Sequence, residues 1–485
     1  MTRRQRVVVI GGGITGLTVC YRLIREAQAR HLPLDVVLLE ASERLGGVIA
    51  TSQYQGLVLE HGPDCFITTK PWGLRLCEEL GLTQELLSTT TPYRQSFIVR
   101  RGRLLPVPQG FYLMAPGALW PFLTTPLFSW RGKLRMACDL LLPRRRSTED
   151  ESLAHFVTRR LGREALERMA QPMVGGIYTA DPQALSMQAT LPQFVAMERQ
   201  HGSLIRALLY NQRLARQQGQ PADGISGPRY GLFVSLRQGM QTLIEQLAER
   251  LPAGTVRVHS RVRRLQQAPE TQHWTVHLHD QPPLEADALC LAIPAPQAGY
   301  LLADCDVTLA TALQGIPYAS SAVVNVALRR ADVAHPLNGM GFVVPAVEQR
   351  HLIACSFSSV KFAGRAPEGQ VLLRAFVGGA LHTADYAQTD TEILHTVGQE
   401  LRQLLGITGD PLYVGLSRHP QSMAQYHLGH VEQVTYIESL VSRLPGLVLA
   451  GNAYYGVGIP DCIHSGDNAA QALLCQLAPS IRGRS

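Results

Sequence analysis

The chain has 485 residues, of which 46% are hydrophobic and 17% are charged, and its formal net charge is +7. This length suits two or three domains with a sizeable core. The modest basic excess argues against a dedicated nucleic-acid-binding protein and fits a protein that meets anionic small molecules or anionic lipid.

The first predicted elements are a strand, a glycine-rich turn and a helix. VVVI at residues 7–10 is a buried-strand pattern, GGGITG follows it, and LTVCYRLIREAQA has helical amphipathic spacing. Gly11, Gly13 and Gly16 thus give GxGxxG between a strand and a helix. In this pattern the first glycine makes the turn, the second lets backbone approach a pyrophosphate, and the third lets helix and strand pack closely. The unpaired N–H groups at the helix start would face the phosphates.

A second buried strand, LDVVLLE, ends in Glu40, where a carboxylate can accept hydrogen bonds from both ribose hydroxyls. The text EASERLGG then supplies Arg44, Gly46 and Gly47. It resembles the long FAD fingerprint ExxxRxGG of the amine-oxidase-like flavoproteins. The resemblance implies that Arg44 and the two glycines line the diphosphate and the ribityl chain.

The next segment, EHGPDCF, is similar to the same group of flavoproteins. That similarity implies a tight turn at Gly62, Pro63 and Asp64 near the isoalloxazine ring.

Aromatic and basic side chains gather in the middle of the chain. Residues 104–142 are apolar, aromatic and basic with Pro and Gly breaks, and residues 151–210 look mostly helical. Aromatic residues precede the basic run PRRR at 143–146, namely Trp120, Phe122, Phe128 and Trp130. This mixture suits a bilayer interface, and it equally suits a helical core with a solvated basic loop.

A second glycine-rich turn lies near the C-terminus, in LVLAGNAYYGVGIPDCIHSG. In the flavoproteins that the first turn resembles, the FAD domain is discontinuous and the chain returns to it at its end. Pro460 suits the first turn of a helix. Gly451, Gly458 and Ile459 would bring backbone close to the flavin. The helix N-terminus would face the N1/C2 carbonyl edge, where reduction places negative charge that a helix dipole stabilises.

Seven pieces of the chain, in order, resemble the oxygen-dependent porphyrinogen oxidases of haem biosynthesis. They are GGGITGL, EASERLGG, EHGPDCF, GGIYTADPQALSMQATLPQF, RAPEG, MAQYHLGH and AGNAYYGVGIPDCI. The resemblance implies removal of six hydrogens from coproporphyrinogen III in three two-electron steps to FAD, with O₂ giving H₂O₂. Protoporphyrinogen IX is the alternative substrate. The hard chemistry belongs to the cofactor, so no catalytic side chain is expected.

The same resemblance assigns further residues. Thr15 would join the glycines along the diphosphate, and Val262 would flank the adenosine beside Glu40 through its backbone. Gly176 and Ile177 in GGIY would face the macrocycle, and Phe342 in GMGFVV would form an aromatic wall beside it.

Lys70, in FITTKPW, matches a lysine of the Gram-positive coproporphyrinogen oxidases. It would meet a substrate carboxylate, since an anionic porphyrinogen needs a cation, although a surface lysine fits the same pattern. Mitochondrial-type members carry an Arg for this purpose where this chain has Ser96. An open cavity with Lys70 therefore favours the four-carboxylate substrate over the two-carboxylate one.

The chain also departs from the family pattern just before and within the segment MAQYHLGH. The family often has Arg-Trp before MPQY, whereas this chain has Arg418 and His419 before MAQY, with Ala424 in place of Pro. The family pattern therefore does not predict the packing beside His419.

The predicted fold is α/β with an added helical region. A discontinuous Rossmann-like FAD domain would take residues 1–70, 231–294 and 412–478. A mixed-sheet substrate domain would take 295–411 with part of 71–103. A helical, membrane-associating region would take 104–210, joined by a polar connector at 211–230.

No metal site or disulfide framework is expected. The nine cysteines form no CxxC pair and their number is odd, which indicates reduced thiols in the cytoplasm. His427 and His430 in YHLGH lack an accompanying carboxylate or thiol. The basic start runs directly into the first strand, and no apolar run reaches the roughly 18 residues of a membrane span. We therefore expect a cytoplasmic protein, peripheral to the inner face of the cell membrane, with a tetrapyrrole and O₂ as its small-molecule partners. Whether it is a monomer or a homo-oligomer stays open.

Two other classes of protein share part of the pattern. Amine oxidases and carotenoid desaturases have the FAD fingerprint but lack the GGIYTADPQALSM and GIPDCI pieces. A non-catalytic escort protein of the GDP-dissociation-inhibitor type has a similar fold without functional flavin. The intact Arg44, Gly46 and Gly47 and the GVGIPD turn argue against it. A yellow protein with a flavin spectrum would support the enzyme, and a colourless one that cannot be reconstituted would support the escort.

Overall fold

A computed structural model describes residues 4–90, 95–108, 110–116, 118–217 and 233–482. Its first sheet has five parallel strands in the order β12-β2-β1-β16-β22. These strands come from distant parts of the chain: β1 Gln5–Ile10, β2 Leu34–Leu39, β12 Val256–Arg257, β16 Ala288–Leu291 and β22 Leu447–Leu449. The apolar residues of the three central strands β2, β1 and β16 are almost all buried, as expected for parallel strands covered on both faces.

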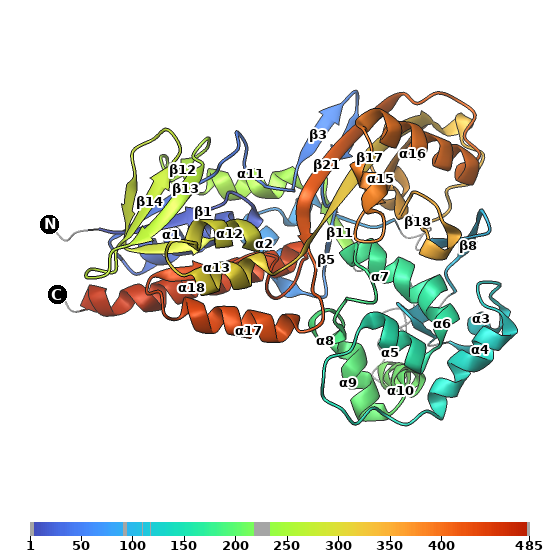
Figure 1. Ribbon diagram of the computed structural model, residues 1–485. Helices are drawn as coiled ribbons and strands as arrows, with labels where there is room; N and C mark the ends of the chain where they lie inside the picture. The colour runs from blue at the N-terminus through green and yellow to red at the C-terminus, as the bar shows by residue number, and fades with distance from the viewer. Residues whose placement is uncertain (1–3, 91–94, 109, 117, 218–232, 483–485) are drawn as a thin grey trace.

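Two helices from opposite ends of the chain pack together on this sheet. Helix α1, Ile14–Ala29, and the long helix α18, Ile459–Arg482, lie side by side, and both termini emerge at the same end of the molecule (Figure 1). The packing is tight, because a Cβ at Gly466 of α18 would lie 2.8 Å from the carbonyl oxygen of Thr15 in α1. Further elements complete this half: α2 Pro71–Glu79, α11 Gln241–Glu249, α12 Ala295–Leu302, α13 Val307–Gln314, α17 His430–Val441, β5 Phe66–Ile67, β6 Leu86–Ser88, β11 Phe233–Leu236, β13 Val262–Gln267, β14 Trp274–Leu278 and β15 Leu284–Ala286. The hairpin of β3 Thr51–Tyr54 and β4 Leu57–Glu60 packs instead against the second large sheet.

The second large sheet has seven strands in the order β21-β17-β20-β19-β18-β7-β8. Its strands are β7 Phe97–Arg100, β8 Arg103–Pro106, β17 Tyr318–Arg329, β18 Gly341–Val343, β19 Ala354–Phe357, β20 Gln370–Gly378 and β21 Tyr413–Ala424. All neighbouring pairs are antiparallel except β18 with β7. Helices α14 Ser358–Lys361, α15 Thr383–Ala387 and α16 Asp390–Leu405 accompany this sheet.

The position of β21 corrects one predicted boundary. The FAD domain was predicted to resume at residue 412, but β21 pairs with β17 along nearly its whole length, from Tyr318↔Ala424 to Ala327↔Tyr413. The chain therefore returns to the first sheet only after residue 424.

A helical region lies below the second sheet in Figure 1. It contains α3 Leu119–Thr124, α4 Trp130–Ala137, α5 Leu153–Arg160, α6 Arg163–Ala165, α7 Gln171–Tyr178, α8 Met187–Thr190, α9 Pro192–His201 and α10 Leu204–Gln217, with the short strands β9 Phe111–Tyr112 and β10 Ala115–Pro116 at its edge. Inside it, the fully buried Arg160 and Asp139 form an ion pair. The start of the predicted connector, residues 211–217, continues α10, and the rest, residues 218–230, lies outside the described residues. Across the part of the chain that the structure describes, no helix combines the length and apolarity that a bilayer crossing requires.

Candidate cofactor and substrate site

The first glycine turn is closely packed on one side and open on the other. Gly11 has φ +109°, and a Cβ there would lie 2.4 Å from the carbonyl oxygen of Ala292. A Cβ at Gly16 would lie only 1.9 Å from the carbonyl oxygen of Gly11. A Cβ at Gly13, in contrast, meets no atom within 4 Å. Gly13 also caps α1 without a side-chain hydrogen bond, so the turn presents free space and helix-start N–H groups on the same side.

Glu40 lies beside this turn. Its carboxylate accepts the Gly12 N–H at 2.7 Å and the Ser42 N–H and hydroxyl at 2.8 Å each. The segment that leads to Val262 runs past the same residue, because the Ser260 N–H donates to the Glu40 carbonyl oxygen at 2.8 Å. The structure thus brings Glu40 and Val262 to the same edge of the first sheet.

The loop 44–49 closes over the first turn. Gly13 and Gly46 form a parallel β-bridge, and the Gly46 N–H donates to the Gly12 carbonyl oxygen at 2.8 Å. The Arg44 guanidinium donates to the carbonyl oxygens of Gly47 at 2.6 Å and Ile49 at 3.0 Å. Arg44 therefore fixes the shape of the loop while its charge stays near the open side of the turn.

A cavity of about 450 Å³ adjoins this loop. It lies between the loop, His61 and the end of β21, and its lining is Arg44, Gly47, Val48, Ala50, His61, Ser417, Arg418, His419, Pro420 and Ser422. The open face at Gly13, the uncapped helix start and the cationic lining fit the anionic diphosphate and polar ribityl chain of FAD.

The second glycine turn lies next to the first, because α18 packs directly on α1. Gly451 has φ +128° and no atom within 4 Å of a built Cβ, and its N–H donates to the Ser465 hydroxyl at 2.9 Å. Helix α18 begins at Ile459, followed by Pro460. The Gly458 carbonyl oxygen accepts the Cys462 N–H at 2.9 Å, so Gly458 leads directly into α18, and the start of this helix can approach the same ligand as the first turn.

The Gly62–Asp64 turn joins the two sheets. A Cβ at Gly62 would lie 1.8 Å from the Val48 carbonyl oxygen, so Gly62 and Pro63 sit against the cavity loop. The Asp64 side chain forms ion pairs with Lys361 at 3.0 Å and Arg374 at 3.1 Å. Burial alone would raise the pKa of Asp64, but these two cations outweigh it and hold that pKa well below its usual range. Asp64 thus anchors the turn through its side chain, and its carbonyl oxygen accepts the Ser235 hydroxyl at 2.6 Å while the Gly62 carbonyl oxygen accepts Arg374.

The predicted substrate residues separate into two groups. In α7, Ile177 is 43% exposed, and Gly176 is exposed with its Cβ position 3.7 Å from the Val343 side chain. Phe342 is only 2% exposed and packs edge-on against Phe357 in the core of the second sheet. The residue that faces α7 is therefore Val343, whose side chain points to the opposite face of the strand from Phe342.

Lys70 lies beside the start of α18 and not beside Gly176 and Ile177. Its ammonium pairs with Asp461 in the first turn of α18 at 2.6 Å, and its side chain is 44% exposed. The structure therefore places Lys70 beside the second glycine turn, with part of its charge neutralised.

Two histidines in the cavity lining were not predicted as site residues. His61 is hydrogen-bonded to Ser417 at 2.8 Å and Ser52 at 2.7 Å, and His419 donates from Nε2 to the His61 carbonyl oxygen at 2.8 Å. Burial, followed by nearby guanidinium charge, lowers the pKa of His61, and burial is also the main cause that lowers the pKa of His419. Both therefore favour the neutral form. The sequence signals toward them were the position of His61 in EHGPDCF and the unusual Arg418-His419 pair.

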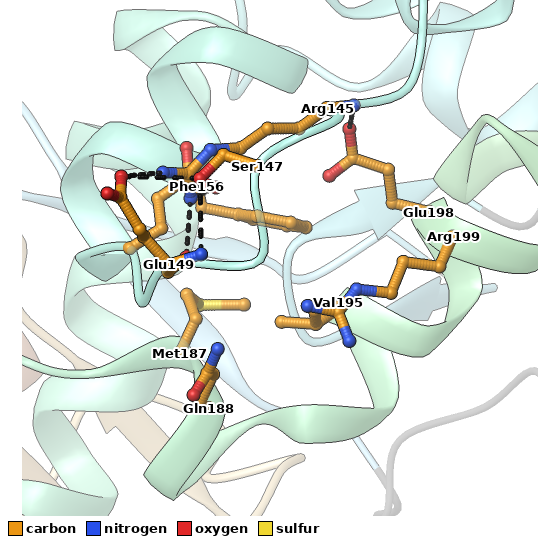
Figure 2. Close-up of a pocket in the computed structure, with 10 residues that line it drawn as sticks. Arg145, Ser147, Glu149, Phe156, Met187, Gln188, Val195, Glu198 and Arg199 are labelled. Carbon is orange, nitrogen blue, oxygen red and sulfur yellow. Dashed lines mark hydrogen bonds and ion pairs between the residues drawn. The ribbon is translucent and has the colours of Figure 1, made fainter. Parts of the chain in front are cut away.

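A further cavity, shown in Figure 2, lies in the helical region. Its volume of about 20 Å³ leaves room for little more than one water molecule. Charged side chains surround it, and the Arg145 N–H donates to Glu198 at 2.9 Å. We interpret this cluster as structural. Among the described residues, no group of three or more His, Cys, Asp or Glu side chains is arranged to hold a metal ion.

Comparison with known proteins adds an independent observation. The family described as flavin-containing amine oxidoreductase matches residues 14–474. The chain is 34% identical to the coproporphyrinogen III oxidase of Bacillus subtilis, over 98% of this chain and 99% of that one. It is 36% identical to the coproporphyrinogen III oxidase of Propionibacterium freudenreichii, over 99% and 93%. A solved structure from Exiguobacterium, assigned as a protoporphyrinogen oxidase, superposes with a TM-score of 0.85 at 31% identity, covering 99% of this chain and 100% of that one.

Proposed function

The chain belongs to the family of flavin-containing amine oxidoreductases, and from this premise we propose that it is an FAD-dependent, oxygen-using coproporphyrinogen III oxidase of haem biosynthesis. The observation that carries this proposal is its similarity, over nearly its full length, to two bacterial enzymes of that name. The glycine turns, Glu40 and Arg44 supply a site that fits FAD.

A bound FAD would supply the hydride acceptor and, with O₂, the route by which six hydrogens leave the macrocycle in three two-electron steps as three H₂O₂. The chain's own residues hold and shape the site. Free helix-start N–H groups at α1 favour an anionic diphosphate, and the Arg44 clamp keeps the loop 44–49 closed over the turn.

The start of α18 favours negative charge in the same way. The N-terminus of α18 would stabilise the negative charge that a bound flavin carries at its N1/C2 edge when reduced. The ion pairs of Asp64 with Lys361 and Arg374 hold the turn at residues 62–64 against the second sheet, so the pocket between the two sheets keeps its shape.

The substrate, in this proposal, lies between α7 and the flavin. Gly176 and Ile177 offer an exposed, apolar and sterically open helix face that suits a flat macrocycle. Lys70 stands beside the second glycine turn with an exposed ammonium that can pair with a substrate carboxylate.

Aerobic oxidation assays test the function directly. We expect coproporphyrinogen III to give porphyrin fluorescence faster than its non-enzymatic oxidation, and faster than protoporphyrinogen IX under the same conditions. Protoporphyrinogen IX is the second candidate substrate because of the near-complete superposition on the Exiguobacterium protein. A strong preference for protoporphyrinogen would exchange the substrate and keep the reaction class.

We further propose peripheral contact with the inner face of the cell membrane through α3 and α4. Four large apolar side chains in these helices or shortly after α4 are well exposed, namely Trp120, Trp130, Leu134 and Leu141. The basic residues 144–146 follow in the chain, and Arg144 and Arg146 are exposed. Interfacial aromatic side chains beside cations suit an anionic lipid surface.

A further inference from the structure

One tyrosine holds both ends of the second glycine turn. The hydroxyl of Tyr426 donates to the Asn452 carbonyl oxygen at 2.7 Å and accepts the Gly456 N–H at 2.7 Å. Gly456 has φ +149°, which directs the chain into the bend before α18. A single buried oxygen atom thus closes the loop that leads into the α18 start.

His430, the second histidine of the same YHLGH segment, holds the middle of the turn. His430 stacks on the Tyr426 ring with 4.0 Å between ring centroids, and its Nε2–H donates to the Tyr454 carbonyl oxygen at 3.1 Å. Both side chains are almost fully buried, at 1% and 3% exposed. Three backbone groups of the turn are therefore held by two stacked rings.

These rings are themselves fixed from the substrate side. The Tyr426 carbonyl oxygen accepts the Ser186 N–H at 2.8 Å. The amide of its neighbour Gln425 donates to the carbonyl oxygen of Tyr178, the last residue of α7, at 2.9 Å. Residues 425–426, which directly follow β21, thus bridge the helix that carries Gly176 and Ile177 and the turn that precedes α18.

We propose that Tyr426 is a positioning residue for the flavin: its hydroxyl holds the turn 452–456 in the shape that sets the N-terminus of α18 against the redox edge of the ring. The inference rests on the proposed flavin site. It also gives His430 a role, because its ring stacks on the ring of Tyr426 and supports it.

Loss of the Tyr426 hydroxyl should weaken the binding of reduced flavin more than the binding of oxidised flavin. The α18 start stabilises charge that is present mainly after reduction. When the tether is lost, the turn relaxes and the helix end no longer meets the ring edge in its best geometry. The midpoint potential should then fall, whereas a loss of global stability alone would not select between the two redox states.

The test compares two tyrosine variants of the flavin-loaded protein. Tyr426→Phe removes one oxygen atom and keeps the ring stack. Tyr454→Phe is the matched control, because its phenol oxygen is equally buried but has no hydrogen-bond partner among the described residues, and its ring belongs to the apolar core beneath the first sheet. We expect Tyr426→Phe to weaken the preference for reduced flavin about tenfold, which is a fall of about 30 mV for a two-electron couple. Its Kd for FAD should rise about tenfold, as for the loss of well-formed hydrogen bonds. Tyr454→Phe should leave both quantities at the wild-type value.

His430→Phe provides a second variant that keeps the stack and removes the bond to the Tyr454 carbonyl oxygen. It should shift the potential in the same direction by a smaller amount. Wild-type potentials in both Tyr426→Phe and His430→Phe would overturn the inference. If the wild type holds flavin but oxidises no porphyrinogen, the proposed function fails while these potentials still decide the role of Tyr426. A wild type that cannot bind flavin would overturn both.

Discussion

The Lys70 ammonium and the Asp461 carboxylate form an ion pair at 2.6 Å, at the point where α18 begins. Residue 70 precedes α2 and residue 461 follows the second glycine turn, so this contact ties two distant segments at the same end of the first sheet. Because the Lys70 side chain is 44% exposed, an anionic ligand can still reach it.

Replacing Lys70 with Ala should raise the KM for coproporphyrinogen III about three- to tenfold and leave kcat nearly unchanged, since an exposed charge-assisted contact contributes modestly to binding. Steady-state porphyrin fluorescence measures both constants. Lys70→Arg retains the charge and is the control, with a KM near that of the wild type. An unchanged KM in Lys70→Ala would remove this residue from the substrate site.

Two glycines of the first turn should respond differently to the same substitution. Gly13→Ala places its methyl group in open space at φ −73°, so the apoprotein should melt at the wild-type temperature while its Kd for FAD rises at least tenfold. Gly16→Ala places its methyl group 1.9 Å from the Gly11 carbonyl oxygen and should also destabilise the apoprotein, by roughly 1–3 kcal/mol for such overpacking.

Thermal melts of the deflavinated proteins and titration with FAD fluorescence separate these effects. Tight FAD binding by Gly13→Ala would show that the open side of the turn is not the cofactor side.

Removing the Asp64 charge should destabilise the protein strongly. Asp64→Asn leaves the buried cations of Lys361 and Arg374 without their carboxylate, a change that typically costs about 3 kcal/mol. Urea unfolding at pH 7 measures this loss. A variant as stable as the wild type would mean that the ion pairs contribute no net stability.

The same carboxylate predicts a pH dependence. Its pKa in the folded state is held well below the value in the unfolded chain, about 3.9. Its contribution is therefore fully present above that unfolded value and is lost as pH falls through it toward the folded pKa. As the pH falls from 5 to 3 the stability advantage of the wild type over Asp64→Asn should begin to decrease, and it should keep decreasing below pH 3. Parallel stability curves for the two proteins over this range would contradict the assignment.

The membrane proposal predicts binding to anionic vesicles that weakens with salt. The double variant Trp120→Ala, Trp130→Ala should lose most of this binding, because it removes the two exposed aromatic side chains of α3 and α4. Tyr300→Ala, which is 71% exposed on α12 of the other half, is the matched control and should bind like the wild type. Sedimentation with phosphatidylglycerol vesicles provides the measurement, and equal binding by all three proteins would exclude this face.

Local sequence patterns predicted the first sheet and its turns, whereas the pairing of strands that are distant in the sequence could not be predicted. GxGxxG and the acid at Glu40 are defined by spacing within a single βαβ unit, so their positions in the fold could be predicted from the sequence. Strand β21 is half-exposed and polar, and its partner β17 lies about 100 residues earlier, so nothing local assigned residues 413–424 to the second sheet.

The direction in which side chains point within a strand was the other feature that could not be predicted from the sequence. In β18, Phe342 and Val343 point to opposite faces, and a one-residue difference decides which of them meets α7. The contact between His61 and His419 joins the loop after β4 to β21, so neither histidine could be placed in the cavity without the fold.

Both glycine turns should contact the same FAD molecule. A crystal structure of the flavin-loaded protein would show whether they do. We predict one FAD with its diphosphate against Gly13 and Gly47 and its ring edge against Gly458 and Pro460. An FAD that touches the first turn but lies away from residues 451–461 would contradict the account.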